Sequence, residues 1–434
     1  MTRFTCPSRR HPSGEMRWVA LVLVAVTTAS SQVAGAAMWT EGPPLPLARY
    51  FHVAASDRAG AVYAFGGLVQ LYPESPRHGL GGEFGVVILD PSLGAWRVGP
   101  LHPWFRYISR MESRKYRIST SGEPEKLISV GVSESDSTRG PEHETPPGTG
   151  GRDGRIYWFA PPGPIIFDPE QGAWTQPPPP IWNSDERRWL PPVPTWVRGG
   201  GVTASAPDGK IYLVGGEGYT LDPAKHDLRP GNLHSLLDSL EVYDPAANTW
   251  ESRAPLRRAR QVFAGTFGRD GRLYIFGGYG HKGVVRRMNY SSDAEYEAAA
   301  AEMERLSRNA LRSVEIYDPA TDRWSEGARM PEGRHAMGAA LGADGRIYVV
   351  GGAVSYSSPK GEDDVFVYDP VAASWSRGPR LRTGRCHHAV TVTPAGKIYA
   401  IGGIGPKQER LVSVEVLDTA EPAPPLVAPG SDRG

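Results

Sequence analysis

One short pattern recurs along most of this 434-residue chain and restricts its fold more than any other feature. Its full form is an apolar residue, Tyr, two more apolar residues and a pair of Gly, and it occurs at 62–67, 211–216, 273–278, 347–352 and 398–403. A sixth copy, at 156–161, ends in Ala-Pro instead of the Gly pair. Self-similarity at a minimum interval of about fifty residues indicates a fold built from copies of one supersecondary unit.

Two further landmarks keep the same register along the chain. Each copy is followed by an apolar segment that ends in an aromatic residue or Leu and then Asp, at Asp90, Asp168, Asp244, Asp318, Asp369 and Asp418. A Trp comes six residues after the first five of these, at Trp96, Trp174, Trp250, Trp324 and Trp375. An Arg follows ten residues after the Trp, except after Trp174, where the interval is fourteen residues longer.

The sixth Trp lies at the other end of the repeat region. Trp39, in Met38-Trp39-Thr40-Glu41-Gly42, matches the segment around Trp324, and Arg49 follows Trp39 at the same ten-residue interval. We therefore expect the segment around Trp39 to supply the last strand of the last repeat. Such a closure joins the repeats into a ring and removes the exposed sheet edges that invite aggregation.

Turn residues at fixed places favour an all-β fold. Asp-Gly precedes three copies of the pattern, at 208–209, 270–271 and 344–345, and Asp-Gly between alternating strands is the signal of a tight hairpin. The chain holds 52 Gly and 41 Pro, an excess that stays below the share typical of disordered chains. We expect the Gly pairs to lie where a side chain would clash, and the Trp side chains to be buried between repeats.

The Gly pair, the Tyr-Asp and the Trp together resemble kelch repeats over residues 38–419. The resemblance implies an all-β fold, a six-bladed kelch β-propeller with four strands, a to d, in each blade. The last blade is then closed by the N-terminal strand around Trp39. In kelch proteins the b–c and d–a connections build the binding face. The second repeat departs from the pattern at Ala160-Pro161, which leaves the geometry of that blade open.

The long connections fall on one predicted face of the propeller. They are the b–c segments 68–85, 217–240, 279–313 and 353–364 and the d–a segment 175–197. Loops that gather on one side of a rigid scaffold often carry function. In blade 4 a capping box at Ser292 precedes apolar residues at helical spacing, which predicts a short helical insertion, either a lid on the rim or a docking helix. The irregular stretch 119–151 is expected to join strands a and b of blade 2, on the opposite face.

Three groups of residues are candidates for binding. Six Arg begin the predicted innermost strands: Arg49, Arg106, Arg198, Arg260, Arg334 and Arg385. They either form a cationic ring for carboxylates at the channel mouth or brace their own blades. Trp182, Trp189 and Trp196 either stack on sugar rings or pack their loop against its neighbours. His52 and His388, three residues after two of the Arg, are candidate loop contacts.

We expect no metal ion and no cofactor, and we name no catalytic residue. Cys386, His387 and His388 are consecutive, but neighbours on a strand point to opposite faces, so they do not easily share one ion. Galactose oxidase, a secreted kelch-bearing copper enzyme, needs a Tyr cross-linked to Cys, and Cys386 does not match that motif. The chain also lacks the common hydrolase, nucleotide-binding and zinc-protease motifs.

The start of the chain is typical of an export signal. Arg17 precedes the apolar run 19–26, which is too short to span a membrane, and small residues follow up to Ala37. Met16 is an alternative start of translation. The expected division of the chain is a signal peptide at 1–37, a propeller at 38–419 and a disordered tail at 420–434. We therefore expect a secreted or periplasmic protein with no transmembrane anchor after cleavage, in which Cys386 has no disulfide partner.

The formal net charge of +1 gives no basic field that would favour nucleic acid as a partner. The resemblance and the loop positions favour an exported, non-catalytic and monomeric recognition propeller that binds a glycan, a peptide or an envelope protein on its long-loop face. Two alternatives stay open. One is an enzyme on acidic sugars, similar to exported kelch mutarotases that handle sialic acid, and the other is a metal-dependent oxidase similar to galactose oxidase. Fold alone does not decide among them.

Overall fold

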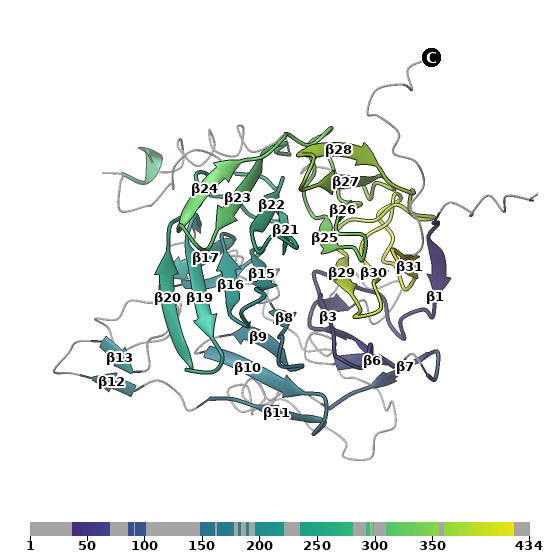
Figure 1. Ribbon diagram of the computed structural model, residues 1–434, viewed down its shortest axis with the longest axis horizontal. Coiled ribbons are helices and arrows are strands. Elements are labelled where there is room, and N and C mark those ends of the chain that lie inside the picture. Colours follow the sequence, from purple (N-terminus) through teal and green to yellow (C-terminus); the bar gives the residue numbers. More distant parts are fainter. Residues whose placement is uncertain are drawn as a thin grey trace, which may run out of the picture. The chain divides into compact units, whose positions relative to one another are not determined.

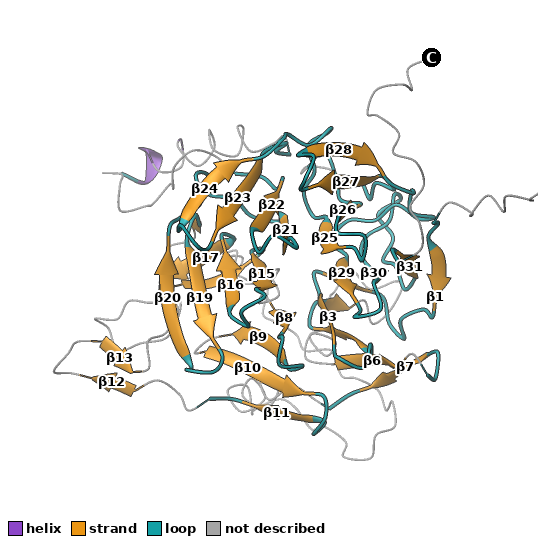
Figure 2. Cartoon of the chain, in the orientation of Figure 1, coloured by secondary structure: helices purple, strands orange, loops and turns teal. Residues whose placement is uncertain are grey.

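Six four-stranded antiparallel sheets carry the six repeats, and each sheet is one blade of a β-propeller (Figure 1). The computed structural model describes residues 37–69, 86–90, 92–100, 148–160, 163–177, 181–183, 188–190, 196–220, 235–280, 292–295, 298, 310–355 and 360–420. Residues 1–36 of the predicted signal peptide and residues 421–434 of the predicted tail lie outside the described residues. Within the described part, strands joined by loops and turns dominate (Figure 2).

The strands of blades 1 to 3 follow one another outwards in chain order. Blade 1 consists of β3 (Val53–Ser56), β4 (Val62–Phe65), β6 (Val86–Asp90) and β7 (Ala95–Val98). Blade 2 consists of β8 (Gly148–Gly150), β9 (Ile156–Ala160), β10 (Gly163–Asp168) and β11 (Ala173–Thr175). Blade 3 consists of β15 (Val202–Ser205), β16 (Ile211–Val214), β19 (Leu240–Asp244) and β20 (Thr249–Arg253).

Blade 6 differs from the others because its outermost strand comes from the start of the described chain. Blade 4 consists of β21 (Ala264–Phe267), β22 (Leu273–Phe276), β23 (Val314–Asp318) and β24 (Arg323–Glu326). Blade 5 consists of β25 (Gly338–Leu341), β26 (Ile347–Val350), β27 (Val365–Asp369) and β28 (Ser374–Arg377). Blade 6 consists of β29 (Ala389–Val392), β30 (Lys397–Ile401), β31 (Val414–Asp418) and β1 (Thr40–Gly42). Glu41 of β1 pairs with Glu415 of β31, so the closure predicted around Trp39 is confirmed.

The core lies in the seams between neighbouring blades. Strand β22 is buried at all four positions, as are β4, β16 and β26. In the seam between blades 3 and 4, Tyr212 and Val214 pack with Phe267 and Ile275. Each of these second strands is covered on both faces, which explains why the repeat pattern reads as a continuous apolar run rather than as an alternation.

The Trp side chains of five blades link the outer strand to the blade before it. The Nε1 of Trp324 in blade 4 donates a hydrogen bond to the carbonyl oxygen of Ala254, which follows blade 3, at 2.7 Å. The same bond recurs from Trp39 to Pro379, from Trp96 to Pro43, from Trp174 to Pro100 and from Trp375 to Ala328. These side chains are buried or half-buried, in agreement with their predicted position between repeats.

The Gly pair is required by close approaches, as shown in blade 6. Gly402 has a φ of 58°, and a Cβ there would lie 2.6 Å from the carbonyl oxygen of Arg49 in blade 1. Gly403 has a φ of 96°, and a Cβ there would lie 2.7 Å from the Cβ of His388 in its own blade. A side chain at either position would clash and would be strained in its backbone conformation, so the prediction for the Gly pair is confirmed.

Blade 2 corrects one prediction. Its innermost strand is β8, which lies inside the stretch 119–151 that we expected to join strands a and b. Strand β8 leads directly into the hairpin where the N–H of Gly151 donates to the carbonyl oxygen of Arg155. The connection from β7 to β8 is therefore of the d–a kind: it joins strand ends on the long-loop side, not on the opposite side. The signal was present, because Gly151–Arg155 (GRDGR) repeats the hairpin sequence of Gly268–Arg272 in blade 4.

Other parts of the long connections form small additional elements. Strand β2 (Arg49–Tyr50) pairs with β5 (Leu68–Val69), and β14 (Trp196–Gly199) forms a sheet with β17 (Glu217–Thr220) and β18 (Ser235–Leu236). Strands β12 (Ile181–Asn183) and β13 (Arg188–Leu190) form a separate hairpin. The predicted helical insertion begins as expected, since 293–295 are helical and the N–H of Glu295 donates to the Oγ of Ser292 (Figure 2).

Candidate functional site

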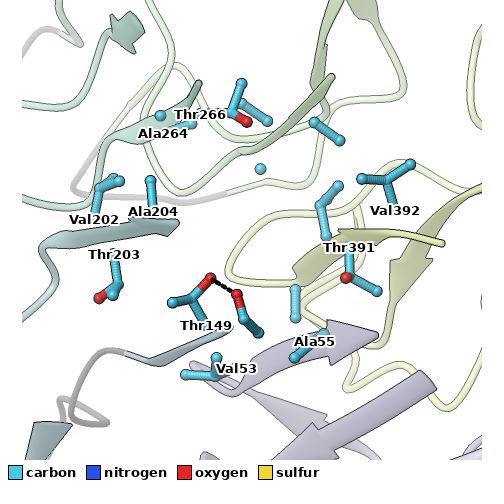
Figure 3. A pocket seen from close by; sticks show the side chains of 18 of the residues that line it. Val53, Ala55, Thr149, Val202, Thr203, Ala204, Ala264, Thr266, Thr391 and Val392 are labelled. Carbon is cyan, nitrogen blue, oxygen red and sulfur yellow. Dashed lines mark hydrogen bonds between the residues drawn. The ribbon is translucent and has the colours of Figure 1, made fainter. Parts of the chain in front are cut away.

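A central channel of about 990 Å³ runs between the innermost strands of the six blades. These strands contact one another in the order β3, β8, β15, β21, β25, β29 and back to β3. Figure 3 shows Thr149, Thr203, Thr266 and Thr391 around this cavity, each from a different blade and set among Ala and Val side chains. The channel wall thus combines apolar surface with hydroxyl groups from several sides.

The two ends of the channel differ in the connections that surround them. The loop end is lined by Phe51, Gly200, Val262, Ala336 and His387, which precede the innermost strands. The hairpin end is lined by residues of the a–b turns, among them Arg58, Arg152, Arg269, Ala343 and Pro394. The strands that the b–c and d–a connections join begin and end on the side of the loop end, because strand directions alternate within each blade.

An open ring of backbone hydrogen bonds, which runs from blade 3 through blades 4, 5 and 6 to blade 1, surrounds most of the loop end. The N–H of Val262 donates to Gly200, that of Ala336 to Val262, that of His387 to Ala336 and that of Phe51 to His387, at 2.7–2.9 Å. All five residues have positive φ angles, between 50° and 59°. A β-branched residue such as Val262 adopts this conformation only at a cost of about 1–3 kcal/mol. The ring therefore links blades 3, 4, 5, 6 and 1 directly and fixes the shape of the opening.

Two of the predicted arginines form buried ion pairs inside their own blades. The Nη1 of Arg260 donates to the carbonyl oxygen of Gly277 at 3.0 Å, and its Nη2 pairs with Glu315 on β23. In blade 6 the Nη1 of Arg385 donates to Gly402 at 3.1 Å, and its Nη2 pairs with Glu415 on β31 at 2.6 Å. All four charged side chains are buried. Burial lowers the pKa of both arginines, and the neighbouring glutamates oppose that effect.

The same glutamates hold the d–a connections that lead into these blades. Glu315 accepts a hydrogen bond from the backbone N–H of Arg257 at 2.9 Å. Glu415 accepts bonds from the N–H groups of Arg382 and Thr383 at 2.7 and 3.0 Å. Each Arg–Glu pair therefore joins the b–c corner, the third strand and the d–a loop of its blade.

Blades 5 and 1 hold their arginines differently. Arg334 pairs with Glu332 at 2.8 Å and with Asp364 at 3.1 Å, and it lies 5.3 Å from the ring of Phe366, which occupies the place of Glu315. Arg49 donates to the carbonyl oxygens of Ala64 and Gly66 at 3.4 Å each. Burial lowers the pKa of the Arg49 guanidinium to about 10.

The four described guanidiniums make the contacts of the bracing alternative. They point into their own blades, so their predicted binding of carboxylates at the channel mouth has no support from these contacts and stays a prediction. Arg106 lies outside the described residues. For Arg198 the structure describes the backbone, on β14, but not the side chain. The acidic partners Glu315 and Glu415 were not predicted, although both lie two residues before the aromatic residue or Leu of the third strand.

His52 and His388 are buried in the seams rather than in the loops. His388 lies against Gly351 of blade 5, and His52 lies against Gly402 of blade 6. Phe263 and Met337 fill the equivalent positions of blades 4 and 5, against Gly215 and Gly277. Neither ring nitrogen of His52 or His388 has a hydrogen-bond partner among the described residues. Burial and the nearby Arg49 and Arg385 lower the pKa of both histidines well below its usual value.

The residues around Cys386 form an aromatic cluster at the loop end. The rings of Phe51 and His387 are 4.0 Å apart between centroids, and the guanidinium of Arg410 lies 4.2 Å over the ring of Tyr50. Burial raises the pKa of the Cys386 thiol to about 12 and lowers that of His387 to about 3. The thiol is therefore protonated and the imidazole neutral at pH 7. Within the described part of the chain, no group of three or more His, Cys, Asp or Glu is arranged to hold a metal ion.

The tryptophans of the predicted binding loop lie on two of the additional elements. Trp182 and Trp189 are directly opposite each other in the β12–β13 hairpin, and Trp196 begins β14. The structure describes the backbone of these strands and not their side chains. The choice between stacking on sugars and packing of the loop stays open.

Comparison with known proteins decides the family. The Kelch motif matches residues 198–257, 305–331, 334–382 and 385–421. These matches identify the repeats of this chain as kelch repeats. It is 30% identical over 220 residues to alpha-scruin of Limulus polyphemus, which covers 42% of this chain and 23% of that protein. It is 32% identical over 179 residues to Kelch-like protein 36 of Mus musculus, which covers 35% of this chain and 29% of that protein.

An F-box/kelch-repeat protein of Arabidopsis thaliana is 29% identical over 171 residues, or 39% of this kelch chain and 32% of that protein. The similarity thus spans less than a third of the length of these three relatives. Among solved structures, that of YjhT superimposes with a TM-score of 0.53 at 13% identity, over 89% of this chain and 99% of that one. This likeness supports the fold. No helix among the described residues has both the length and the apolar character needed to cross a membrane.

Proposed function

We propose that this kelch propeller is an exported, non-catalytic recognition protein that binds a protein partner on its loop end. The proposal rests on the difference in connection length between the two faces of the propeller. The a–b connections are short hairpins, such as 268–272, whereas every connection of more than ten residues between blade strands joins strand ends on the loop-end side. A rigid scaffold that varies its loops on one side is the usual arrangement for recognition.

The bases of these loops are held rigidly. The Arg260–Glu315 and Arg385–Glu415 pairs tie the corners of blades 4 and 6, and the ring of backbone bonds joins neighbouring blades at the opening. A binding surface whose base does not rearrange loses less conformational entropy on association. This rigidity supports binding through a preformed face.

The loop end also exposes aliphatic side chains on neighbouring blades. Leu47 is 44% exposed and Val412 is 43% exposed, and their loops are joined by the bond from the N–H of Leu45 to the carbonyl oxygen of Val412. Val354, on the b–c loop of blade 5, is 39% exposed. Val412 follows Arg410 by two residues, and exposed apolar residues together with arginine are typical of protein interfaces.

Site-specific photo-cross-linking in the cells that make the protein tests the proposal. A photoreactive phenylalanine in place of Val412 should give a discrete cross-linked protein product. The matched control places the same residue at Leu93, which is 68% exposed in a c–d turn on the hairpin side. Equal products from both positions, or none from Val412, would contradict the use of the loop end.

Export is the second part of the proposal and needs its own test. Ala37 is buried with Trp39 in the seam of blades 5 and 6, so a mature chain that starts at about residue 37 keeps the closing strand. Cell fractionation with N-terminal sequencing should find the protein outside the cytosol with its first residue at or near Ala37. A cytosolic product that retains residues 1–36 would show that the leader is not an export signal.

A further inference from the structure

The hairpin end of the channel carries three arginines that the proposed loop-end function does not use. Arg58, Arg152 and Arg269 belong to the a–b turns of blades 1, 2 and 4, are exposed, and line the channel. Their positions break the repeat, since the equivalent residues in blades 5 and 6 are Ala343 and Pro394. A repeat architecture therefore does not require them.

Two of the three are held in place by the neighbouring blade. The Nη2 of Arg58 donates to the carbonyl oxygen of Arg152 at 2.7 Å, and the Nη2 of Arg269 donates to that of Ala343. Glycines make room for both side chains, because a Cβ at Gly154 or Gly345 would stand 3.3–3.4 Å from the Cδ atom of the arginine that crosses it. Each guanidinium has five N–H donors, and one fixed bond orients the others.

The acidic residues of the same turns are already engaged. Asp57, the one acid among the described residues that line the channel, accepts hydrogen bonds from the hydroxyl of Tyr63 at 2.8 Å and from a backbone N–H. Asp153 and Asp270 accept from Tyr157 and Tyr274 at 2.7 Å each. No described carboxylate forms an ion pair with Arg58, Arg152 or Arg269. Among the residues that line the hairpin end of the channel, these three arginines face a single carboxylate, that of Asp57, so positive charge exceeds negative charge in the lining.

Other arginines on these turns behave differently. Arg155 lies 3.8 Å from Asp153 and 3.5 Å from Asp168, and Arg272 lies 4.0 Å from Asp270 and 3.8 Å from Asp318. Neither of them lines the channel. Among the described residues, the turns thus pair their outer arginines with carboxylates and leave those at the channel opening unpaired.

We propose that the hairpin end of the channel binds a small oxyanion with Arg58, Arg152 and Arg269 as its cationic groups. Cations from three blades around one opening suit a ligand with two or more carboxylate or phosphate groups, which guanidinium donors bind with charge-assisted hydrogen bonds. The low-dielectric channel wall strengthens the field at its mouth. Thr149 and Thr266 also line the channel, and their hydroxyl groups can contact polar parts of a ligand that enters it.

Calorimetric titration of the propeller with citrate and with pyrophosphate, at low ionic strength and without metal ions, tests this site. We expect saturable binding of at least one of them and none of glycerol. Binding of citrate alone assigns a carboxylate ligand, and binding of pyrophosphate alone assigns a phosphate ligand. If neither anion binds, the proposal is wrong.

Variants locate the binding. Arg152→Gln should weaken the affinity about tenfold, the expected cost of one charge-assisted contact. It keeps the backbone carbonyl that Arg58 uses, so a thermal melt like that of the parent is expected. Arg155→Gln removes the same charge from the same turn away from the channel and should bind as the parent does. An equal loss in both variants would mean that binding depends on general charge and would overturn the site. Because this site lies at the opposite end from the loop-end proposal, either can fail without the other.

Discussion

The arginines at the two ends of the channel have the same side chain and opposite environments. At the loop end Arg260 and Arg385 are fully buried and pair with glutamates of their own blades. At the hairpin end Arg58 and Arg152 are exposed and form no ion pair with a described carboxylate. The first set recurs at a fixed interval after Trp, whereas the second set appears in some blades and not in others.

Regular and irregular charged positions in a repeat protein therefore need different explanations. A charged residue that keeps its register from blade to blade is explained by the structure of the blade itself. The four described arginines of this set all contact their own blades, and in blades 4 and 6 they do so through a buried glutamate of the third strand. A charged residue that departs from the register is not needed for the blade itself. In a ring of similar units, the irregular positions are therefore the better candidates for ligand binding.

The largest expected effect comes from breaking a buried pair at the loop end. Glu415→Ala leaves Arg385 charged and buried, which should lower the free energy of unfolding by about 3–5 kcal/mol. Urea denaturation measures it. The control is Glu326→Ala, which removes a 74%-exposed partner of Arg257 and should cost less than about 1 kcal/mol. Similar losses in both variants would show that the buried pairs do not brace the blades.

Acid should weaken the seams in which the histidines lie. The pKa of His52 and His388 is lower in the folded protein than in the unfolded chain, so the unfolded chain binds protons first as the pH falls below about 6.5. Each histidine should then reduce stability by about 1.4 kcal/mol per pH unit, while stability above that pH is unaffected. His387 is also buried with a lowered pKa and remains in the background of every variant.

Equivalent positions provide the control for this acid effect. The double variant His52→Phe and His388→Met takes the residues that blades 4 and 5 use there, Phe263 and Met337. Its stability should fall less steeply than that of the parent between pH 6.5 and pH 5 in chemical denaturation. Parallel curves for the two proteins would mean that these imidazoles are not held neutral by burial.

The smallest expected effect is at the hairpin end. Arg152→Gln removes an exposed side chain without an ion pair to a described carboxylate, so the free energy of unfolding should change by less than about 0.5 kcal/mol. The same denaturation experiment as for Glu415→Ala measures it. A loss of several kcal/mol would place Arg152 among the bracing arginines and remove the contrast between the two ends.

Much of the fold could be predicted because the strand register is set by short motifs whose residues are close together in the sequence. The Gly pairs, the Asp-Gly turns and the Trp–Arg interval gave six blades and the closure by Trp39. The innermost strand of blade 2 was placed wrongly, since the long connection before β8 separates it from the Arg that marks the strand in other blades. The local hairpin sequence Gly151–Arg155 was the better guide, because hairpin geometry depends on adjacent residues and not on the length of a loop.

The site was less predictable for a physical reason. The positions of Arg260 and Arg385 followed from the sequence, but their direction depends on partners that lie on another strand, Glu315 and Glu415. His52 and His388 were candidate loop contacts, but both are buried in the seams between blades, at the position that Phe263 occupies in blade 4. The arginines of the hairpin end were missed because a single irregular Arg next to a turn carries no pattern.

Chemical labelling of arginine tests the central contrast most directly. The native protein is treated with phenylglyoxal, and the modified residues are quantified by peptide mass spectrometry. Arg58, Arg152 and Arg269 should be labelled rapidly, while Arg260, Arg334 and Arg385 should react only after unfolding, because their guanidiniums are buried. Labelling of Arg260 and Arg385 at the rate of Arg152 in the native protein would contradict the account.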